Sequence, residues 1–198
     1  MDGRGALDVV EVRPGDPQRV LTLLPGRGYT PQAPLLHFTS SLLLERGWTV
    51  REVWWGRLPP TGDPETDARQ ALVEGERALR AVQAREHVVV AKSLGTRLLP
   101  VARELGLPGV WLTPLLREDV VRGALGAPDK PSLLVGGTAD NAAWDPEVAE
   151  QARLDGWDVL EVPGADHSLE LPGDARGSLR VLEQVLDRVE GLIGRLQR

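Results

Sequence analysis

Stretches typical of β-strands alternate with stretches typical of α-helices along nearly the whole chain. The strand-like stretches are short and rich in valine and leucine, and the helical patterns between them are too long to be turns. This alternation predicts an α/β fold, with a mostly parallel central sheet and helices packed on both of its faces. Strands are expected at 6–12, 19–24, 48–54, 88–90, 109–112, 132–135 and 158–162, and helices at 34–46, 64–85, 95–105, 115–125, 147–154 and 177–196.

Size and composition narrow the class of protein. The 198 residues show no shift in composition and no internal repeat, so a single domain over residues 1–198 is expected. A net charge of −6 without a run of basic residues argues against nucleic-acid binding. No cysteine is present, which excludes disulfides, thiolate zinc sites and cysteine nucleophiles. No signal peptide or apolar stretch long enough to span a bilayer is evident, so we expect a cytoplasmic protein without membrane attachment.

One junction between a strand and a helix carries a serine in a special position. The run Val88–Val90 is typical of a buried strand, and Ser93 stands in the turn before a helical pattern that begins at Gly95. Ala91 lies two residues before the serine and Gly95 two residues after it. A sharp strand–serine–helix turn flanked by small residues is the layout of a nucleophile elbow. Ser93 is therefore a candidate nucleophile, and capping of the following helix is the alternative role.

Two further loops at strand ends carry an acid and a base. Asp140 follows the strand at 132–135, and His167 follows the strand at 158–162. Sites in parallel sheets form beyond the carboxyl ends of the strands, where these three residues are all expected. A serine hydroxyl needs an imidazole to take its proton, and the imidazole needs a carboxylate to orient it and stabilise its charge. Ser93, Asp140 and His167 are the predicted catalytic residues.

Other acids and bases compete for these roles. Asp145 is a rival acid, but it precedes a proline and fits the cap of a helix better. Asp166, beside the histidine, is expected to hold the shape of its loop. His37 falls in a helical pattern and His87 before a strand, at the wrong end of the sheet. Lys92 is expected to be solvated or paired with an acid, and a serine–lysine mechanism is the less favoured alternative.

At these motifs the chain resembles the α/β-hydrolase superfamily, in its compact, lid-poor branch of small esterases and dienelactone-hydrolase-like proteins. The resemblance extends from about Val20 to the C-terminus and rests on residues 91–95, 137–140 and 163–169. The chain departs from the family at Ala91, where the elbow usually has glycine, and at Pro25-Gly26, where many members have His-Gly. The resemblance implies the α/β-hydrolase fold and a serine hydrolase. Its substrate would be an ester or thioester of a small to medium molecule, cleaved through an acyl-enzyme.

The resemblance also implies an oxyanion hole made of main-chain groups. One N–H would come from Leu94, the residue after the nucleophile, and the other from Arg27, with Gly28 as the next candidate. Only 19 residues separate Leu112 from Ser132, so no separate lid domain and an open site are expected.

Aromatic residues near the strand ends are candidates for a substrate pocket. Tyr29, Trp55 and Trp144 are the predicted pocket residues, and a place in the core is the alternative for each. No metal-ligand spacing is present, and the Gly26-x-Gly28 pair lacks the third glycine of a dinucleotide-binding loop. Neither a metal nor a cofactor is expected, and the partner is a small-molecule substrate. A homo-oligomer is not indicated.

Two other functions fit the same motifs. One is a non-catalytic α/β-hydrolase scaffold that binds a ligand or a partner, because a fold does not fix a function. The other is a transferase that passes the acyl group to an acceptor other than water.

Overall fold

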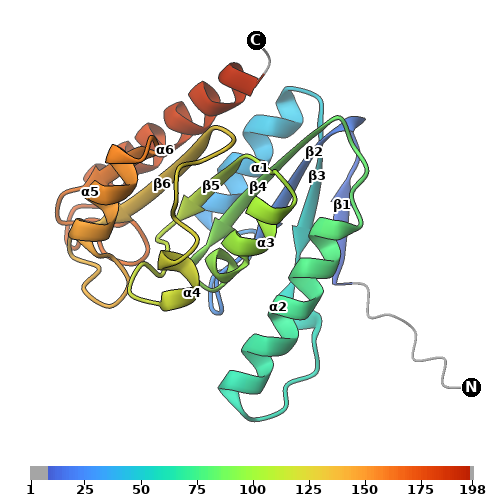
Figure 1. The fold of residues 1–198 in the computed structure, drawn as a ribbon, viewed down its shortest axis with the longest axis horizontal. Helices are drawn as coiled ribbons and strands as arrows, with labels where there is room; N and C mark the ends of the chain where they lie inside the picture. Colours follow the sequence, from blue (N-terminus) through green and yellow to red (C-terminus); the bar gives the residue numbers. More distant parts are fainter. Residues whose placement is uncertain (1–8, 197–198) are drawn as a thin grey trace, which may run out of the picture.

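The computed structural model describes residues 9–196 and has a seven-stranded sheet at its centre (Figure 1). The strands lie in the order β1-β3-β2-β4-β5-β6-β7, and β1 is antiparallel to β3 while every other neighbouring pair is parallel. The predicted α/β architecture is therefore confirmed. The strands are β1 (Val10–Arg13), β2 (Asp16–Leu24), β3 (Trp48–Val53), β4 (Glu86–Lys92), β5 (Gly109–Leu112), β6 (Ser132–Gly137) and β7 (Asp158–Val162).

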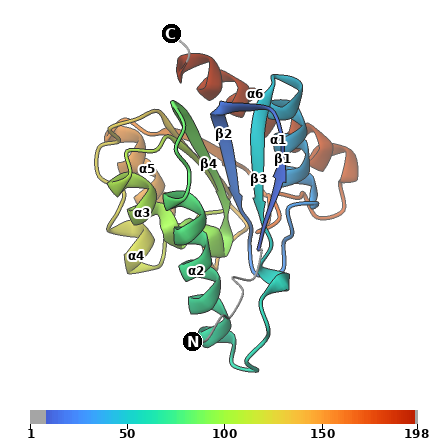
Figure 2. The same cartoon turned by 90° about the vertical axis from the view of Figure 1, so that its right-hand side faces the viewer.

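The helices cover both faces of the sheet (Figure 2). Helices α1 and α6 lie on one face, and α2, α3, α4 and α5 lie on the other. The α-helices are α1 (Pro34–Glu45), α2 (Pro64–Arg80), α3 (Leu99–Glu104), α4 (Asp119–Arg122), α5 (Pro146–Leu154) and α6 (Ala175–Leu196), and short 3₁₀ helices occupy η1 (Trp55–Arg57) and η2 (Ser93–Leu98).

Strand β4 shows why the sheet needs cover on both sides. Val88 and Val90 pack into the core under α1 and α6, whereas Val89 and Ala91 pack into the core under α2 to α5. All four side chains are fully buried, because successive residues of a strand point to opposite faces. An apolar run without polar alternation is thus the signature of a central strand.

Several expected elements differ from the observed ones in extent. The helix expected at 115–125 is the single turn α4, because the chain turns tightly at Thr113, whose φ is +42°, and at Pro114. The helix expected at 64–85 ends at Arg80, since the chain needs residues 81–85 to cross to the start of β4. Of the first strand, expected at 6–12, residues 6–8 lie outside the described part.

The helix after the elbow starts later than the pattern suggested. Its first six residues form the 3₁₀ helix η2, and α3 begins at Leu99. Pro100 sits in the first turn of α3, where a missing N–H is tolerated.

The segment between β5 and β6 contains a single short helix, α4. Within residues 9–196, no helix combines the length and the apolar character needed to cross a membrane.

Candidate active site

The predicted triad residues come from three loops at the same edge of the sheet. Ser93 directly follows β4, Asp140 follows β6, and His167 follows β7. These strands run parallel in one continuous part of the sheet, so their carboxyl ends lie side by side. Residues 74 positions apart in sequence thereby come into contact.

Ser93 has a strained backbone. Its φ is +49°, in the left-handed region that residues with a side chain rarely adopt. Two glycines make this turn possible by close approach: a Cβ at Gly95 would collide with the carbonyl of Leu24, and a Cβ at Gly26 would lie 3.3 Å from the Cβ of Ser93. Strain of this kind is concentrated at functional sites, and here it presents the hydroxyl at the sheet edge.

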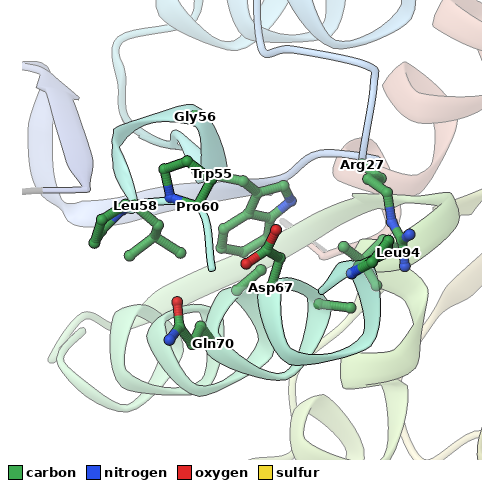
Figure 3. A pocket seen from close by; sticks show the side chains of 12 residues that line it. Arg27, Trp55, Gly56, Leu58, Pro60, Asp67, Gln70 and Leu94 are labelled. Atoms are coloured by element: carbon green, nitrogen blue, oxygen red, sulfur yellow. The ribbon is translucent and has the colours of Figure 1, made fainter. Parts of the chain in front are cut away.

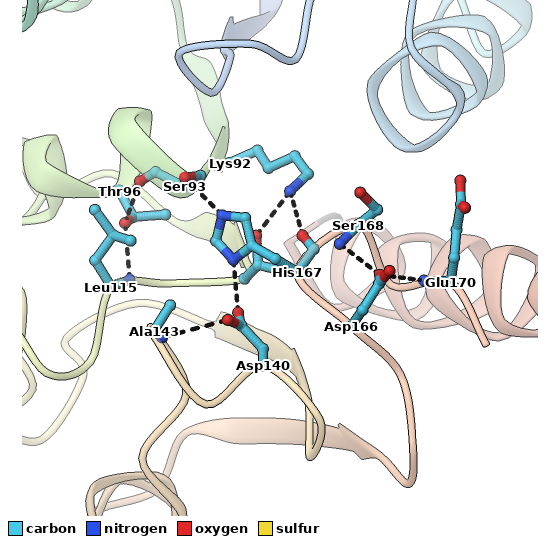
Figure 4. A network of polar contacts seen from close by, with 11 residues as sticks. Lys92, Ser93, Thr96, Leu115, Asp140, Ala143, Asp166, His167, Ser168 and Glu170 are labelled. Carbon is cyan, nitrogen blue, oxygen red and sulfur yellow. Dashed lines mark hydrogen bonds and ion pairs between the residues drawn. The ribbon is translucent and has the colours of Figure 1, made fainter. Parts of the chain in front are cut away.

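A chain of two hydrogen bonds links the three side chains (Figure 4). His167 Nε2 lies 2.8 Å from Ser93 Oγ, and His167 Nδ1 lies 2.6 Å from Asp140 Oδ2. Since a carboxylate only accepts, Nδ1 carries the proton and Nε2 accepts from the serine hydroxyl. The Asp140 side chain is 2% exposed and that of His167 is 44% exposed, so the acid is shielded while the imidazole faces the open edge.

The competing acids have structural roles. Asp145 caps α5, where its carboxylate accepts from the backbone N–H groups of Glu147 and Val148, as the proline after it predicted. The carboxylate of Asp166 accepts from the backbone N–H groups of Ser168 and Glu170 and so holds the shape of the loop around His167.

The competing histidine at the start of β4 is also structural. His87 is buried and its Nε2 lies 2.9 Å from the hydroxyl of Thr22 on β2. Burial lowers the pKa of His87 to about 4, so this imidazole stays neutral.

The loop after β2 lies beside the serine, as an oxyanion hole requires. Gly26 packs against Ser93, so its main chain lies next to the nucleophile, while Leu94 is buried directly after it. The indole N–H of Trp55 donates to the carbonyl of Pro25 at 2.9 Å and ties this loop to η1.

A cavity of about 430 Å³ opens next to these residues (Figure 3). Trp55 forms one wall and the first turns of α2 form the opposite wall, with Arg27 and Leu94 at one end. Its surface is mainly apolar, and its volume lies in the range of pockets for small molecules. The lining residues are Arg27, Trp55, Gly56, Leu58, Pro59, Pro60, Pro64, Asp67, Ala68, Gln70, Ala71 and Leu94.

Known structures share this arrangement of chain. A dienelactone hydrolase from Anabaena variabilis superposes with a TM-score of 0.62 at 18% identity, over 90% of this chain and 88% of that one. An α/β serine hydrolase without a lid from Xanthomonas campestris superposes with a TM-score of 0.57 at 19% identity, over 94% of this chain and 88% of that one. A monoacylglycerol lipase from Paleococcus ferrophilus superposes with a TM-score of 0.63 at 14% identity, over 91% of this chain and 97% of that one. The chain has the α/β-hydrolase fold.

Sequence comparison adds nothing to this structural likeness. No protein-family model matches the chain, and no curated protein matches it. The likeness to these structures therefore lies in the path of the chain.

Of the three aromatic residues predicted to line a substrate pocket, the structure places one in the cavity wall and two elsewhere. Trp55 does line the cavity. Trp144 does not: it is 3% exposed, packs against Gly136 in the core, and donates its indole N–H to Glu161 on β7. That prediction is corrected, because the small Gly136 leaves room for the indole under the sheet edge. Tyr29 lies beside the site, where its hydroxyl accepts from the N–H of Leu35, and it is not among the residues that line the cavity.

Sequence reasoning missed most of the cavity wall. The three prolines that line it, Pro59, Pro60 and Pro64, were given no function. Ala68 and Ala71, one turn apart on α2, also face the cavity, and both are small. The sequence features that could have indicated this cavity are the prolines in the connecting loop and the small residues on the helix that follows.

Lys92 was expected to be solvated or paired with an acid, and this is wrong. Its side chain is 1% exposed, and its ammonium donates to Thr113 Oγ1 at 2.9 Å and to the carbonyl of His167 at 2.7 Å. Burial lowers its pKa to about 8, and Asp140 and Asp166 oppose this effect.

Proposed function

We propose that this protein is a serine hydrolase that cleaves an ester or thioester of a small to medium molecule. The observation that carries the proposal is the hydrogen-bonded chain from Ser93 through His167 to Asp140, with the serine on a strained elbow. Nucleophile and base lie within 2.8 Å, and a buried carboxylate orients the base. No cofactor is needed for this chemistry.

The reaction follows from the positions of these groups. Ser93 Oγ attacks the substrate carbonyl while His167 Nε2 takes the hydroxyl proton, and Asp140 stabilises the imidazolium that forms. The developing oxyanion accepts hydrogen bonds from the backbone N–H groups of Leu94 and Arg27. His167 then gives its proton to the leaving alcohol or thiol. Water, activated by the same imidazole, releases the acid and restores the serine.

The cavity supports a substrate with an apolar group. Its walls are the Trp55 indole, three prolines and two alanines, and it begins at Leu94, directly beside the nucleophile. An apolar acyl or alcohol group of the substrate would occupy it, with the scissile carbonyl at Ser93. The structural neighbours named as dienelactone hydrolase and monoacylglycerol lipase support ester cleavage as the reaction class.

The experiment that tests the proposal is labelling with a fluorophosphonate probe. The wild type should be labelled, Ser93→Ala should not, and Ser41→Ala on α1 should be labelled like the wild type. All three samples should be folded by circular dichroism. Absence of labelling in a folded wild type would instead favour a non-catalytic scaffold.

A second measurement separates hydrolysis from acyl transfer. A panel of p-nitrophenyl esters and acyl thioesters should release free acid at a rate independent of added alcohols or amines. A product that depends on the acceptor would assign an acyltransferase.

A further inference from the structure

Lys92 is buried beneath the candidate active site and makes contacts in three directions. Its ammonium donates to Thr113 Oγ1 and to the backbone carbonyl of His167, and it lies 4.6 Å from the centre of the Tyr29 ring. An ammonium has three donors and no acceptor, so two oxygens and one aromatic face use its full capacity.

These contacts join four of the segments around the site. Lys92 itself precedes the nucleophile, and Tyr29 belongs to the loop that follows β2. Thr113 follows β5, and His167 lies in the loop after β7. Figure 4 shows the Lys92 ammonium between the His167 loop and the end of β5.

The strained residues of the chain lie at the same place. Among residues 9–196, three residues other than glycine have a positive φ: Ser93, Thr113 and Leu169. Ser93 adjoins Lys92, Thr113 accepts its hydrogen bond, and Leu169 lies two residues after His167. Strained backbone persists only where surrounding contacts hold it. The lysine is the side chain that connects these three turns.

The loop around His167 needs a contact with the sheet as well as an internal one. Asp166 fixes the internal shape of the loop through the N–H groups of Ser168 and Glu170. The hydrogen bond from Lys92 to the His167 carbonyl ties the same loop to the end of β4. This hydrogen bond therefore holds the main chain of His167, the residue proposed to act as the base. The serine hydroxyl is bonded to His167, so Lys92 is not placed as the base of a serine–lysine pair.

We propose that Lys92 is a positioning residue that anchors the main chain of His167 and thereby holds the imidazole between Ser93 and Asp140. The inference rests on the proposed hydrolase function. In this role Lys92 neither contacts the substrate nor transfers a proton. Asp166 thus sets the internal shape of the loop around His167, and Lys92 sets the position of that loop relative to the sheet.

The test compares fluorophosphonate labelling rates of the wild type with those of Lys92→Met and Thr113→Val. Methionine keeps the length of the side chain and removes all donors. We expect labelling to slow by about 10- to 100-fold, because small misplacements of catalytic groups cost that much. Thr113→Val leaves the lysine but removes one of its partners, and a threefold to tenfold loss, roughly the worth of one hydrogen bond, is expected. The matched control is Lys130→Met, which changes the other lysine of the chain, outside the site.

Kinetics with p-nitrophenyl butyrate distinguish positioning from loss of folded protein. Lys92 is not among the residues that line the cavity, so kcat should fall with KM changed by less than about twofold. Labelling and kcat of Lys92→Met within twofold of the wild type would overturn the proposal. If circular dichroism shows that Lys92→Met does not fold, Thr113→Val decides, and wild-type labelling of that variant would overturn it.

A second readout does not depend on catalysis. In ¹⁵N-histidine-labelled protein, the two ring nitrogens of His167 should give the signals of a single Nδ1–H tautomer, assigned with His167→Gln. Lys92→Met should move them toward averaged values, and unchanged signals would overturn the positioning role. A wild type that resists labelling while its tautomer still depends on Lys92 would refute the hydrolase function and leave the positioning role standing.

Discussion

The buried lysine gives a prediction about stability that can be tested without any substrate. Burial lowers the pKa of Lys92 from 10.5 to about 8, so the folded protein binds fewer protons at this group than the unfolded chain does between these values. The sequence holds two lysines, and a lysine-labelled sample therefore gives two ¹³Cε signals. The one removed by Lys92→Arg should titrate near pH 8.

The size of the effect follows from linkage. A difference of about 2.5 pKa units corresponds to about 3 kcal/mol, at 1.36 kcal/mol per unit. Because Lys92 has the lower pKa when folded, its burial destabilises the protein by this amount below pH 8. The penalty is relieved as the pH rises to about 10.5. The free energy of unfolding of the wild type, minus that of Lys92→Met, should rise by about 3 kcal/mol across this window.

At pH 7 two opposing effects set the stability of Lys92→Met. The substitution removes the desolvation penalty of about 3 kcal/mol, but it leaves the His167 carbonyl and the Thr113 hydroxyl without a donor, at about 1–3 kcal/mol for each buried group. The variant should thus be close to the wild type or moderately less stable, while its activity falls far more.

Urea denaturation of both proteins at intervals from pH 7 to pH 10.5 measures the difference, in which groups common to the two proteins cancel. Two results would refute the reasoning. One is a stability difference that stays constant across the range, and the other is a Lys92 signal that titrates at the value of an exposed lysine.

Three further predictions address the cavity and a second buried base. Trp55→Phe keeps an apolar wall but loses the N–H bonded to Pro25, and it should lower kcat/KM for esters by about tenfold. The control variant Trp144→Phe should lower the free energy of unfolding by about 1–2 kcal/mol and leave kcat/KM unchanged. Ala71→Leu should narrow the cavity, so kcat/KM for octanoyl esters should fall by at least tenfold while that for acetyl esters stays within about twofold. Equal losses for both esters would contradict this assignment. His87, with its pKa lowered from 6.5 to about 4, contributes stability above pH 6.5 that is lost as the pH falls to 4; the loss, about 3 kcal/mol, should be absent in His87→Gln when urea denaturation at pH 7 and pH 4 is compared.

The strand ends were predictable because their signals are local. A buried run such as Val88–Val90 identifies a central strand, and parallel strands place their carboxyl ends at one edge. Ser93 directly follows such a strand, and Asp140 and His167 lie in the loops after β6 and β7, so their order in the chain was enough to expect them together. The hydrogen bonds between them are present in the structure, and their use in catalysis stays a prediction.

The burial and the contacts of single side chains were not predictable in the same way. Trp144 follows the acid loop, and the sequence does not say whether its indole turns outward or inward. That depends on the space left by Gly136 on another segment. Lys92 likewise has no acidic partner near it in sequence, and its two acceptors lie 21 and 75 residues away. Partners at such distances are fixed by how the strands pair.

One side chain couples the cavity to the loop after β2, for which we propose an oxyanion-binding role. Trp55 contributes its ring to the cavity wall and its N–H to the carbonyl of Pro25, one residue before Gly26. A group that fills the cavity therefore packs against the same indole that anchors the loop beside Ser93. This contact gives substrate shape a direct way to affect the position of the N–H groups that we propose bind the oxyanion. Trp55→Phe should consequently lower kcat more for esters that fill the cavity than for acetyl esters. A uniform loss for both would show that the indole only supports the loop.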